Sequence, residues 1–234
     1  MKTSLLVVLV VTAAILVSVA LFMSREGRLS SSYAAPPEAS APRQSSGHSL
    51  SYNFDNDDVG TMRGKLHGAR TGQGSEGKWV VMADETAPSK PNVVAQTSTD
   101  KTDYRFPLLI SDERSFKDLE LSVKFKAVAG EVDRAAGLVF RLKDANNYYI
   151  VRANALEDNY RLYHVIKGSR RQFAGANFKV TSGEWHELRV EAVGNKIICY
   201  YDSAKKIEAT DDTFNDAAKS VCGPKRTRSL TLTI

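Results

Sequence analysis

Hydrophobic and polar residues alternate with a period of two along most of residues 49–216. In the stretch DLELSVKFKAV (118–128), every second residue from Leu119 to Ala127 is apolar, and the residues between them are charged or polar. This alternation is typical of a β-strand with one face in the core and one in water. Stretches rich in β-branched and aromatic residues follow, separated by Asn, Asp, Gly and Ser turns. They predict further strands over 135–142, 147–155, 159–167, 184–193 and 196–203.

Shorter strands are predicted before residue 100, over 50–55, 78–83 and 92–98. No stretch of 49–216 shows the period of an amphipathic helix. Ten or more short strands joined by tight turns indicate two antiparallel sheets, arranged as a sandwich or a barrel. We therefore predict an all-β fold, a β-sandwich over residues 49–216.

The N-terminal residues predict export. Leu5–Met23 is a run of 19 residues without a charge, and Lys2 precedes it. A membrane span needs about 20 apolar residues, whereas the apolar core of a signal peptide has roughly 7–15. Residues 1–24 are thus predicted to form an apolar helix that is a cleaved signal peptide or a retained anchor, and 25–48, rich in Ser, Ala and Pro, are a disordered, flexible linker. Both alternatives predict a periplasmic, extracellular or membrane-anchored protein, with membrane contact only through residues 5–23 if they are uncleaved.

The basic charge of the chain lies at its two ends. The sequence has a net charge of +5 and a pI of about 9.1, but residues 49–216 alone sum to −1. A nucleic-acid-binding domain shows a basic patch on its folded part. We therefore predict no nucleic-acid partner. Cys199, within the apolar stretch IICYY, is predicted to be a buried hydrophobic residue and not a nucleophile.

Two blocks of sequence carry a family resemblance: NNYYIVRANALEDN (146–159) and GEWHELRVEA (183–192). With them, residues 50–216 resemble bacterial exported proteins of the concanavalin A-like lectin/glucanase superfamily. Within it, they are most similar to 3-keto-disaccharide hydrolase domains and laminin-G-like modules. The resemblance implies a jelly-roll sandwich whose concave sheet faces carbohydrate.

The last 18 residues depart from this pattern. Over 217–234 the alternation stops and Pro224 stands where a strand is expected. Read one frame over, plausible codons give GKVGLWTKADSVTHFDD, which resembles the usual two-strand ending of the family. We interpret 217–234 as a frame-shifted tail. We expect it to lower the stability of the sandwich and to leave 217–228 poorly ordered, while 229–234 pairs weakly.

Candidate ligand-binding residues lie between 141 and 163. On the strand 147–155, Tyr148, Ile150, Arg152 and Asn154 are predicted to share one face. Aromatic rings, planar amides and charged groups together are typical of sugar-binding surfaces. The alternative is a solvated sheet face with cross-strand ion pairs. The candidates are Arg141, Arg152, Asn154, Glu157, Asn159, Arg161 and Tyr163, with a basic stripe if the three arginines share that face.

Catalytic residues and metal ligands are less well marked. A family 16-type glucanase needs E-x-D-x-x-E on one strand, so that two carboxyl groups flank the bond that breaks. The nearest match, Glu131-Val132-Asp133, lacks the second glutamate, and Gly130 places it in a turn. Asp55 and Asp57 are candidate ligands of a structural calcium, although an Asx-rich turn explains them equally. No other cofactor is predicted.

The sequence therefore favours an exported protein that recognises carbohydrate on the concave face of a β-sandwich. Two alternatives stay open. One is a glycoside hydrolase that acts on a 3-keto-disaccharide or a related glycoside. The other is a structural or protein-interaction module at the cell surface. Whether the protein is an enzyme is left undecided at this stage.

Overall fold

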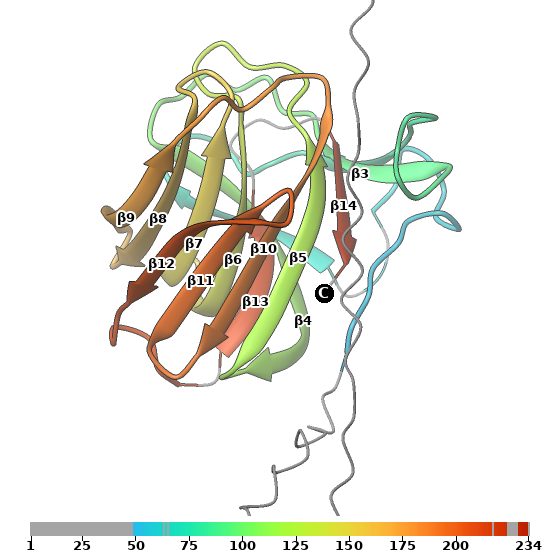
Figure 1. Ribbon diagram of the computed structural model, residues 1–234. Helices are drawn as coiled ribbons and strands as arrows, with labels where there is room; N and C mark the ends of the chain where they lie inside the picture. The colour runs from blue at the N-terminus through green and yellow to red at the C-terminus, as the bar shows by residue number, and fades with distance from the viewer. Residues whose placement is uncertain (1–48, 63, 65, 217, 224–228, 234) are drawn as a thin grey trace, which may run out of the picture. The chain divides into compact units, whose positions relative to one another are not determined.

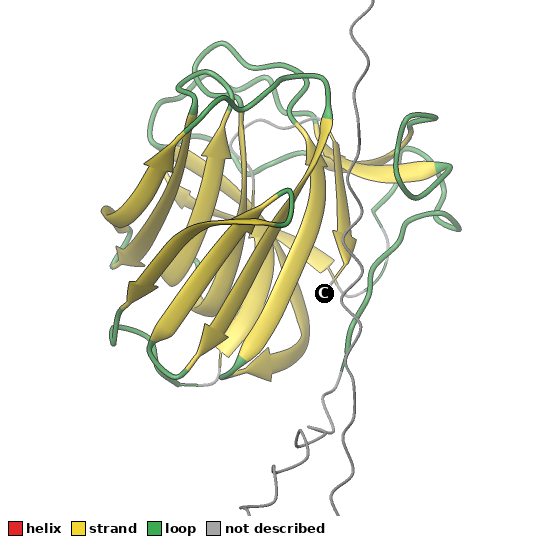
Figure 2. Ribbon diagram, viewed as in Figure 1, coloured by secondary structure: helices red, strands yellow, loops and turns green. Residues whose placement is uncertain are grey.

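The computed structural model describes residues 49–62, 64, 66–216, 218–223 and 229–233. Within these residues the chain forms fourteen strands and no helix (Figures 1 and 2). The predicted leader (1–24) and linker (25–48) lie outside the described residues. In the part of the chain that is described, nothing has the length and apolar composition of a membrane-crossing helix.

The strands form two seven-stranded antiparallel sheets (Figure 1). The sheet farther from the viewer, called the back sheet, has the order β1 (Leu66–Gly72), β4 (Arg105–Phe116), β13 (Ala218–Gly223), β6 (Ala135–Asp144), β7 (Asn147–Asn154), β8 (Asn159–Ile166) and β9 (Ser169–Asn177). The front sheet has the order β12 (Ala204–Thr210), β11 (Lys196–Tyr201), β10 (Trp185–Val193), β5 (Leu119–Lys126), β14 (Ser229–Thr233), β3 (Asn92–Gln96) and β2 (Trp79–Ala83).

The main core fills the space between the sheets, and the predicted alternation supplies it. Leu121, Val123 and Phe125 of β5 are buried there, while the residues between them lie on the other face of the strand. On β7 the inner residues are Tyr149 and Val151 together with Ala153. Cys199 is buried in the same core as predicted, and burial raises the pKa of its thiol. The β-sandwich is therefore confirmed.

Most predicted strands are present, and the differences have physical causes. β2, β3, β5, β6, β7, β8, β10 and β11 match predicted stretches, but 50–55 forms only a single bridge at Ser51. Four strands before residue 217 were missed: β1, β4, β9 and β12. The first seven residues of β4 are all buried, and from Phe106 to Ile110 both faces are apolar, so no alternation is visible. β9 contains Gly175 and two adjacent arginines, which conceal its strand character.

A second, smaller core lies on the outer face of the back sheet. Leu108 and Ile110 of β4 pack there with Val139, Ile150 and Val165 of the neighbouring strands. β1, cyan in Figure 1, is an edge strand of the back sheet. It passes behind other strands of the sheet and pairs with the first half of β4. The Thr71 hydroxyl lies 2.8 Å from the Tyr148 hydroxyl, so β1 also bonds to β7. The β1–β4 pair thus covers the apolar half of this outer face.

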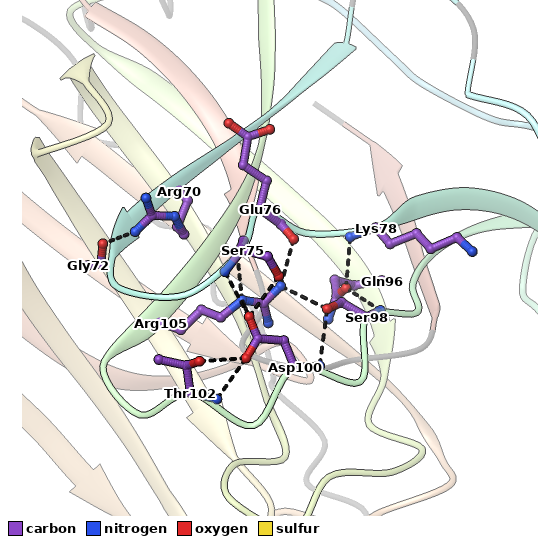
Figure 3. Close-up of polar contacts among 10 residues, drawn as sticks. All are labelled: Arg70, Gly72, Ser75, Glu76, Lys78, Gln96, Ser98, Asp100, Thr102 and Arg105. Carbon is purple, nitrogen blue, oxygen red and sulfur yellow. Dashed lines mark hydrogen bonds and ion pairs between the residues drawn. The ribbon is translucent and has the colours of Figure 1, made fainter.

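Arg105 anchors the start of β4 (Figure 3). Its guanidinium is 3% exposed and donates to the carbonyls of Ser75 (2.6 Å) and Glu76 (2.7 Å) and to the Ser98 hydroxyl (3.0 Å). Asp100 lies 3.3 Å from the same guanidinium, and hydrogen bonds from Thr102 and Ser75 hold the pKa of its carboxyl far below the usual value. Arg105 thereby ties together the loop that contains Ser75 and Glu76 and the loop that contains Ser98 and Asp100.

The C-terminal segment differs from the prediction. We expected 217–228 to be poorly ordered, but Ala218–Gly223 forms β13 between β4 and β6, in the middle of the back sheet. Ser229–Thr233 forms β14, which pairs with β5 and β3 as the predicted alternation of 229–234 suggested. Residues 217, 224–228 and 234 lie outside the described residues. The frame-shift interpretation itself stays a prediction.

Candidate functional site

Of the candidate ligand residues, all but Arg141 lie on the outer face of the back sheet or in the β7–β8 turn beside it. On β7, Tyr148 and Ile150 belong to the outer core, while Tyr149 and Val151 belong to the inner one. Strand alternation then places Arg152 and Asn154 on the outer face, as predicted. The sheet passes from apolar to polar along this face as β7 runs toward its C-terminal end.

Arg152 is the centre of the polar part. Its guanidinium lies 3.0 Å from Asp133 of the β5–β6 loop and 2.9 Å from Glu157 of the β7–β8 turn. The side chains of Arg152 and Asp133 are only 6% and 4% exposed, whereas Glu157 is 55% exposed. A buried arginine needs such partners, because an unpaired charge out of water is costly. The sequence pointed to Arg152 and Glu157, but it gave Asp133 no role in a ligand site.

Asn154 and Asn159 complete the polar cluster. Asn159 donates to Glu157 at 2.8 Å, and Asn154 accepts a hydrogen bond of 2.9 Å from the backbone of Leu156. Burial raises the pKa of Glu157, but the donors of Asn159 and Arg152 outweigh it and hold the pKa below its usual value. Among the described residues, the buried atoms here that have no hydrogen-bond partner include Asn154 Nδ2, Asn159 Oδ1 and Arg152 Nε. Such atoms are rare in folded proteins and mark a place for water or a ligand.

Arg161 lies beside Arg152 on the neighbouring strand. The two are paired across β7 and β8, in a row that runs Gly137, Arg152, Arg161 and Gly175. Arg161 turns away from Arg152 and donates to the Ala176 carbonyl (2.8 Å) and Asn177 (2.5 Å). Gly175 permits this, because a Cβ there would lie 2.8 Å from Arg161 Cδ. Both arginines therefore border the site, and a backbone carbonyl already accepts a hydrogen bond from the Arg161 guanidinium.

Aromatic rings meet arginines where the polar and apolar parts join. Tyr163 of β8 is 7% exposed, and the Arg152 guanidinium lies 5.8 Å from its ring centroid. Arg170 of β9 lies 4.5 Å from the same ring and 4.4 Å from that of Phe106. Tyr163 was predicted, but Arg170 and Phe106 were missed. The Lys167-Gly168 turn was the available signal, since a hairpin there places Arg170 opposite Val165, two residues from Tyr163.

Arg141 does not belong to this site, so the predicted stripe of three arginines is wrong. Its backbone has a φ of +50°, within an irregularity of β6 that shifts the register between Phe140 and Asp144. The side chain is fully buried and donates to the carbonyls of Lys117 (2.9 Å) and Phe214 (3.2 Å). Simple alternation along β6 cannot foresee this, because a bulge changes which face a residue meets.

The acidic residues considered as a catalytic pair and as metal ligands have other partners. Glu131 forms an exposed ion pair of 2.7 Å with Lys101, whereas the Asp133 carboxylate lies 3.0 Å from the Arg152 guanidinium, so the two carboxylates have different partners. Asp55 accepts a hydrogen bond of 2.8 Å from the Ser89 hydroxyl, and the Asp57 carbonyl accepts one of 3.0 Å from Asn92. Within the described ranges, no three His, Cys, Asp or Glu side chains are grouped to hold a metal. The structural calcium at Asp55 and Asp57 stays a prediction.

Solved structures share this architecture. The carbohydrate binding module CBM66 from Bacillus subtilis is 19% identical, with a TM-score of 0.54 over 67% of this chain and 88% of that one. The Bacillus licheniformis beta-glucanase is 12% identical, with a TM-score of 0.51 over 81% of this chain and 87% of that one. At these identities the likeness concerns the fold alone. It confirms the concanavalin A-like sandwich.

Sequence comparison identifies the family. No curated protein matches the chain. A family profile described as a 3-keto-alpha-glucoside-1,2-lyase-like domain matches residues 65–232, which include both sheets and the polar cluster around Arg152. The resemblance stated from the sequence is thereby confirmed. The chain belongs to the family of 3-keto-alpha-glucoside-1,2-lyase-like domains.

Proposed function

We propose that the protein binds carbohydrate on the outer face of its back sheet, at a site that we call the Arg152 site. The Arg152 site consists of Asp133, Arg152, Asn154, Glu157, Asn159, Arg161 and Tyr163. We take this face to be the concave face predicted from the sequence. Family membership and the shared fold support a role with carbohydrate, and the site geometry is what points to this face.

One observation carries the proposal: buried polar atoms of Arg152, Asn154 and Asn159 have no hydrogen-bond partner among the described residues. Two of these atoms are N–H donors and one is a carbonyl acceptor, and the Tyr163 ring lies beside Arg152. Sugar hydroxyls donate and accept at once, so a pair of them satisfies this mixture. The apolar C–H face of a sugar ring packs on an aromatic ring. The set thus fits a sugar better than a purely anionic or purely apolar ligand.

The ion pairs of Arg152 pre-organise the site. Asp133 comes from one loop and Glu157 from another, and Arg152 holds both in place. A ligand then meets groups that are already oriented, which lowers the entropy lost on binding. The exposed hydrophobic residues Val132 (46%) and Leu156 (42%) lie next to these two carboxylates in sequence.

A second candidate function is cleavage of a 3-keto-glucoside, and the family description favours it. Elimination from such a sugar needs a base that removes the proton next to the ketone and an acid that protonates the leaving oxygen. Glu157 is partly exposed, and its lowered pKa keeps it ionised near neutral pH. It therefore suits the base and not the acid. Binding without cleavage remains the first proposal.

The test measures bound sugar and released sugar together. We would expose the full-length protein to a panel of polysaccharides and 3-keto-disaccharides, with Arg152→Met and Asn159→Ala as variants. Arg171→Met is the matched control, because Arg171 is exposed on β9 outside the Arg152 site. We expect Arg152→Met to weaken retention by at least about tenfold, the usual size of a lost hydrogen bond to a charged group, and Asn159→Ala by about fivefold, the size for a neutral one. The control should bind as the wild type does.

Each other outcome has a definite meaning. Retention that survives both Arg152→Met and Asn159→Ala contradicts the placement of the site. Sugar release that Glu157→Gln abolishes replaces the first proposal by the second. No bound or released sugar with any member of the panel favours a structural or protein-interaction module. Asn159→Ala guards against the case in which Arg152→Met does not fold, since it removes one amide and leaves the buried ion pair.

We also propose that the protein works outside the cytoplasm, on the evidence of the apolar run at residues 5–23 and the Ser/Ala/Pro-rich linker. Fractionation of cells that express the full chain tests this. Recovery in the cytoplasm with an intact N-terminus would contradict it.

A further inference from the structure

Arg170 is an arginine of the outer face that carbohydrate binding as proposed does not use. It is half-buried on β9, and its guanidinium lies 4.4 Å from the ring centroid of Phe106 and 4.5 Å from that of Tyr163. Tyr163 also contacts Arg152, so Arg170 stands directly beside the Arg152 site. Phe106 in turn follows Arg105, which the hydrogen bonds of Figure 3 fix in place. Arg170 is therefore held in a defined position.

Arg170 has no carboxylate within ion-pair distance among the described residues, although the charge of Asp133 acts on it from farther away. Asp133 and Glu157 both contact Arg152. Burial and the nearby charge of Arg152 lower the pKa of the Arg170 guanidinium. The two rings compensate part of its charge through their π-electrons, but they accept no strong hydrogen bonds from its N–H groups. A partly desolvated cation with free donors favours an anion.

Resting on the carbohydrate site proposed above, we infer that the sugar bound there is acidic and that its carboxylate pairs with Arg170. The planar fork of a guanidinium matches the two oxygens of a carboxylate. Because rings lie near Arg170 on two sides, its N–H edge is the part left for a ligand. A uronic acid residue fits both the Arg152 site and Arg170. Its hydroxyls form hydrogen bonds with the Arg152 site, and its carboxylate forms an ion pair with Arg170.

The experiment compares two ligands that differ only at one carbon. Methyl α-D-glucopyranosiduronate carries a carboxylate where methyl α-D-glucopyranoside carries a hydroxymethyl group. Titrations of the full-length protein are followed by NMR, which detects millimolar binding. We expect the uronate to bind about tenfold more tightly at low salt, which is the gain in affinity that one charge-assisted hydrogen bond gives. Added salt should reduce this preference.

Two variants assign the preference to Arg170. Arg170→Gln should abolish it, whereas Arg171→Gln, its neighbour on the same strand, should retain it. Arg170→Lys keeps the charge without the planar fork, so we expect a reduced but measurable preference. If Arg170→Gln does not fold, Arg170→Lys still tests whether the preference for the uronate depends on Arg170. A third ligand, methyl α-D-glucopyranoside 6-sulfate, distinguishes a carboxylate from a tetrahedral anion.

The outcomes separate this inference from the proposed function. Equal binding of uronate and neutral glycoside, lost in Arg152→Met, leaves the carbohydrate site standing and overturns the acidic ligand. A preference that persists in Arg170→Gln overturns the role of Arg170. Tighter binding of the sulfate ester than of the uronate overturns the choice of a carboxylate. No binding of any of the three ligands contradicts both the site and the inference.

Discussion

Arg141 and Arg152 lie on neighbouring strands and are both buried, yet their guanidinium groups meet different partners. Arg141 donates to the carbonyls of Lys117 and Phe214, and among the described residues the carboxylate that approaches it is that of Asp118 at 3.7 Å. Arg152 forms close ion pairs with Asp133 and Glu157. The first arrangement ties together two distant turns, whereas the second prepares a polar surface. Residue type alone does not distinguish these roles.

Replacing Arg141 by methionine should therefore harm the fold and not the site. The change leaves two carbonyls without their donor in a buried region, so we expect the free energy of unfolding to fall by about 3 kcal/mol. Urea denaturation followed by tryptophan fluorescence measures this. The folded fraction should bind sugar with the affinity of the wild type. If the variant keeps its stability but loses affinity for sugar, Arg141 belongs to the ligand-binding surface and this prediction is wrong.

The sequence predicts site residues well where strands are regular. Alternation along 147–155 places Arg152 and Asn154 on one face, and the structure agrees because β7 has no bulge between Tyr148 and Asn154. It fails at Arg141, where the register of β6 shifts, and at Arg170, whose strand is too polar to be recognised. Asp133 was missed for another reason. It approaches Arg152 from a loop, and a loop conformation has no periodicity to read.

At the scale of elements, the β1–β4 pair decides how much of the outer face stays open. Its sequence gives little sign of this role, since β1 reads LHGARTG and the start of β4 is apolar on both faces. The pair ends at Gly72, which has a φ of +81°. A Cβ at Gly72 would lie 1.9 Å from the carbonyl oxygen of Tyr104. Glycine is thus required where β1 meets the residue before Arg105.

Gly72→Ala should destabilise this element far more than the same change at Gly183. Gly183 also has a positive φ, +79°, but no atom lies within 4 Å of a Cβ built there. The left-handed conformation costs an alanine about 1–2 kcal/mol at either position, and only Gly72 adds a backbone clash. We expect Gly72→Ala to lower the free energy of unfolding by about 3 kcal/mol and Gly183→Ala by about 1 kcal/mol. Equal losses in thermal or urea denaturation would contradict this account of the β1 end.

At the scale of the whole molecule, the last two strands join the sheets that the rest of the chain builds. β13 lies between β4 and β6 in the back sheet, and β14 lies between β5 and β3 in the front sheet. Each strand supplies hydrogen bonds to two neighbours, and the family match also extends to residue 232. The C-terminal sequence therefore bears on the stability of both layers.

The alternative reading of this segment, GKVGLWTKADSVTHFDD, gives a prediction for the entire fold. Placed from residue 217 onward, its stretches VGLWT and SVTHFDD fall on the positions of β13 and β14. Both stretches are richer in β-branched and aromatic residues than the present tail, and such residues suit central strands. A chain that carries this ending should be more stable by about 2 kcal/mol or more, the contribution of one large side chain on burial.

Urea denaturation of the two full-length chains tests this, with a scrambled ending of the same composition as the control. Greater stability of the frame-shifted reading over both other chains supports a shifted frame near codon 217, and resequencing that stretch of DNA then locates the change. Equal or lower stability would mean that the tail as written is adapted to the centre of both sheets. In that case Ala218–Gly223 and Ser229–Thr233 pair there through backbone hydrogen bonds that do not depend on the family's usual residues.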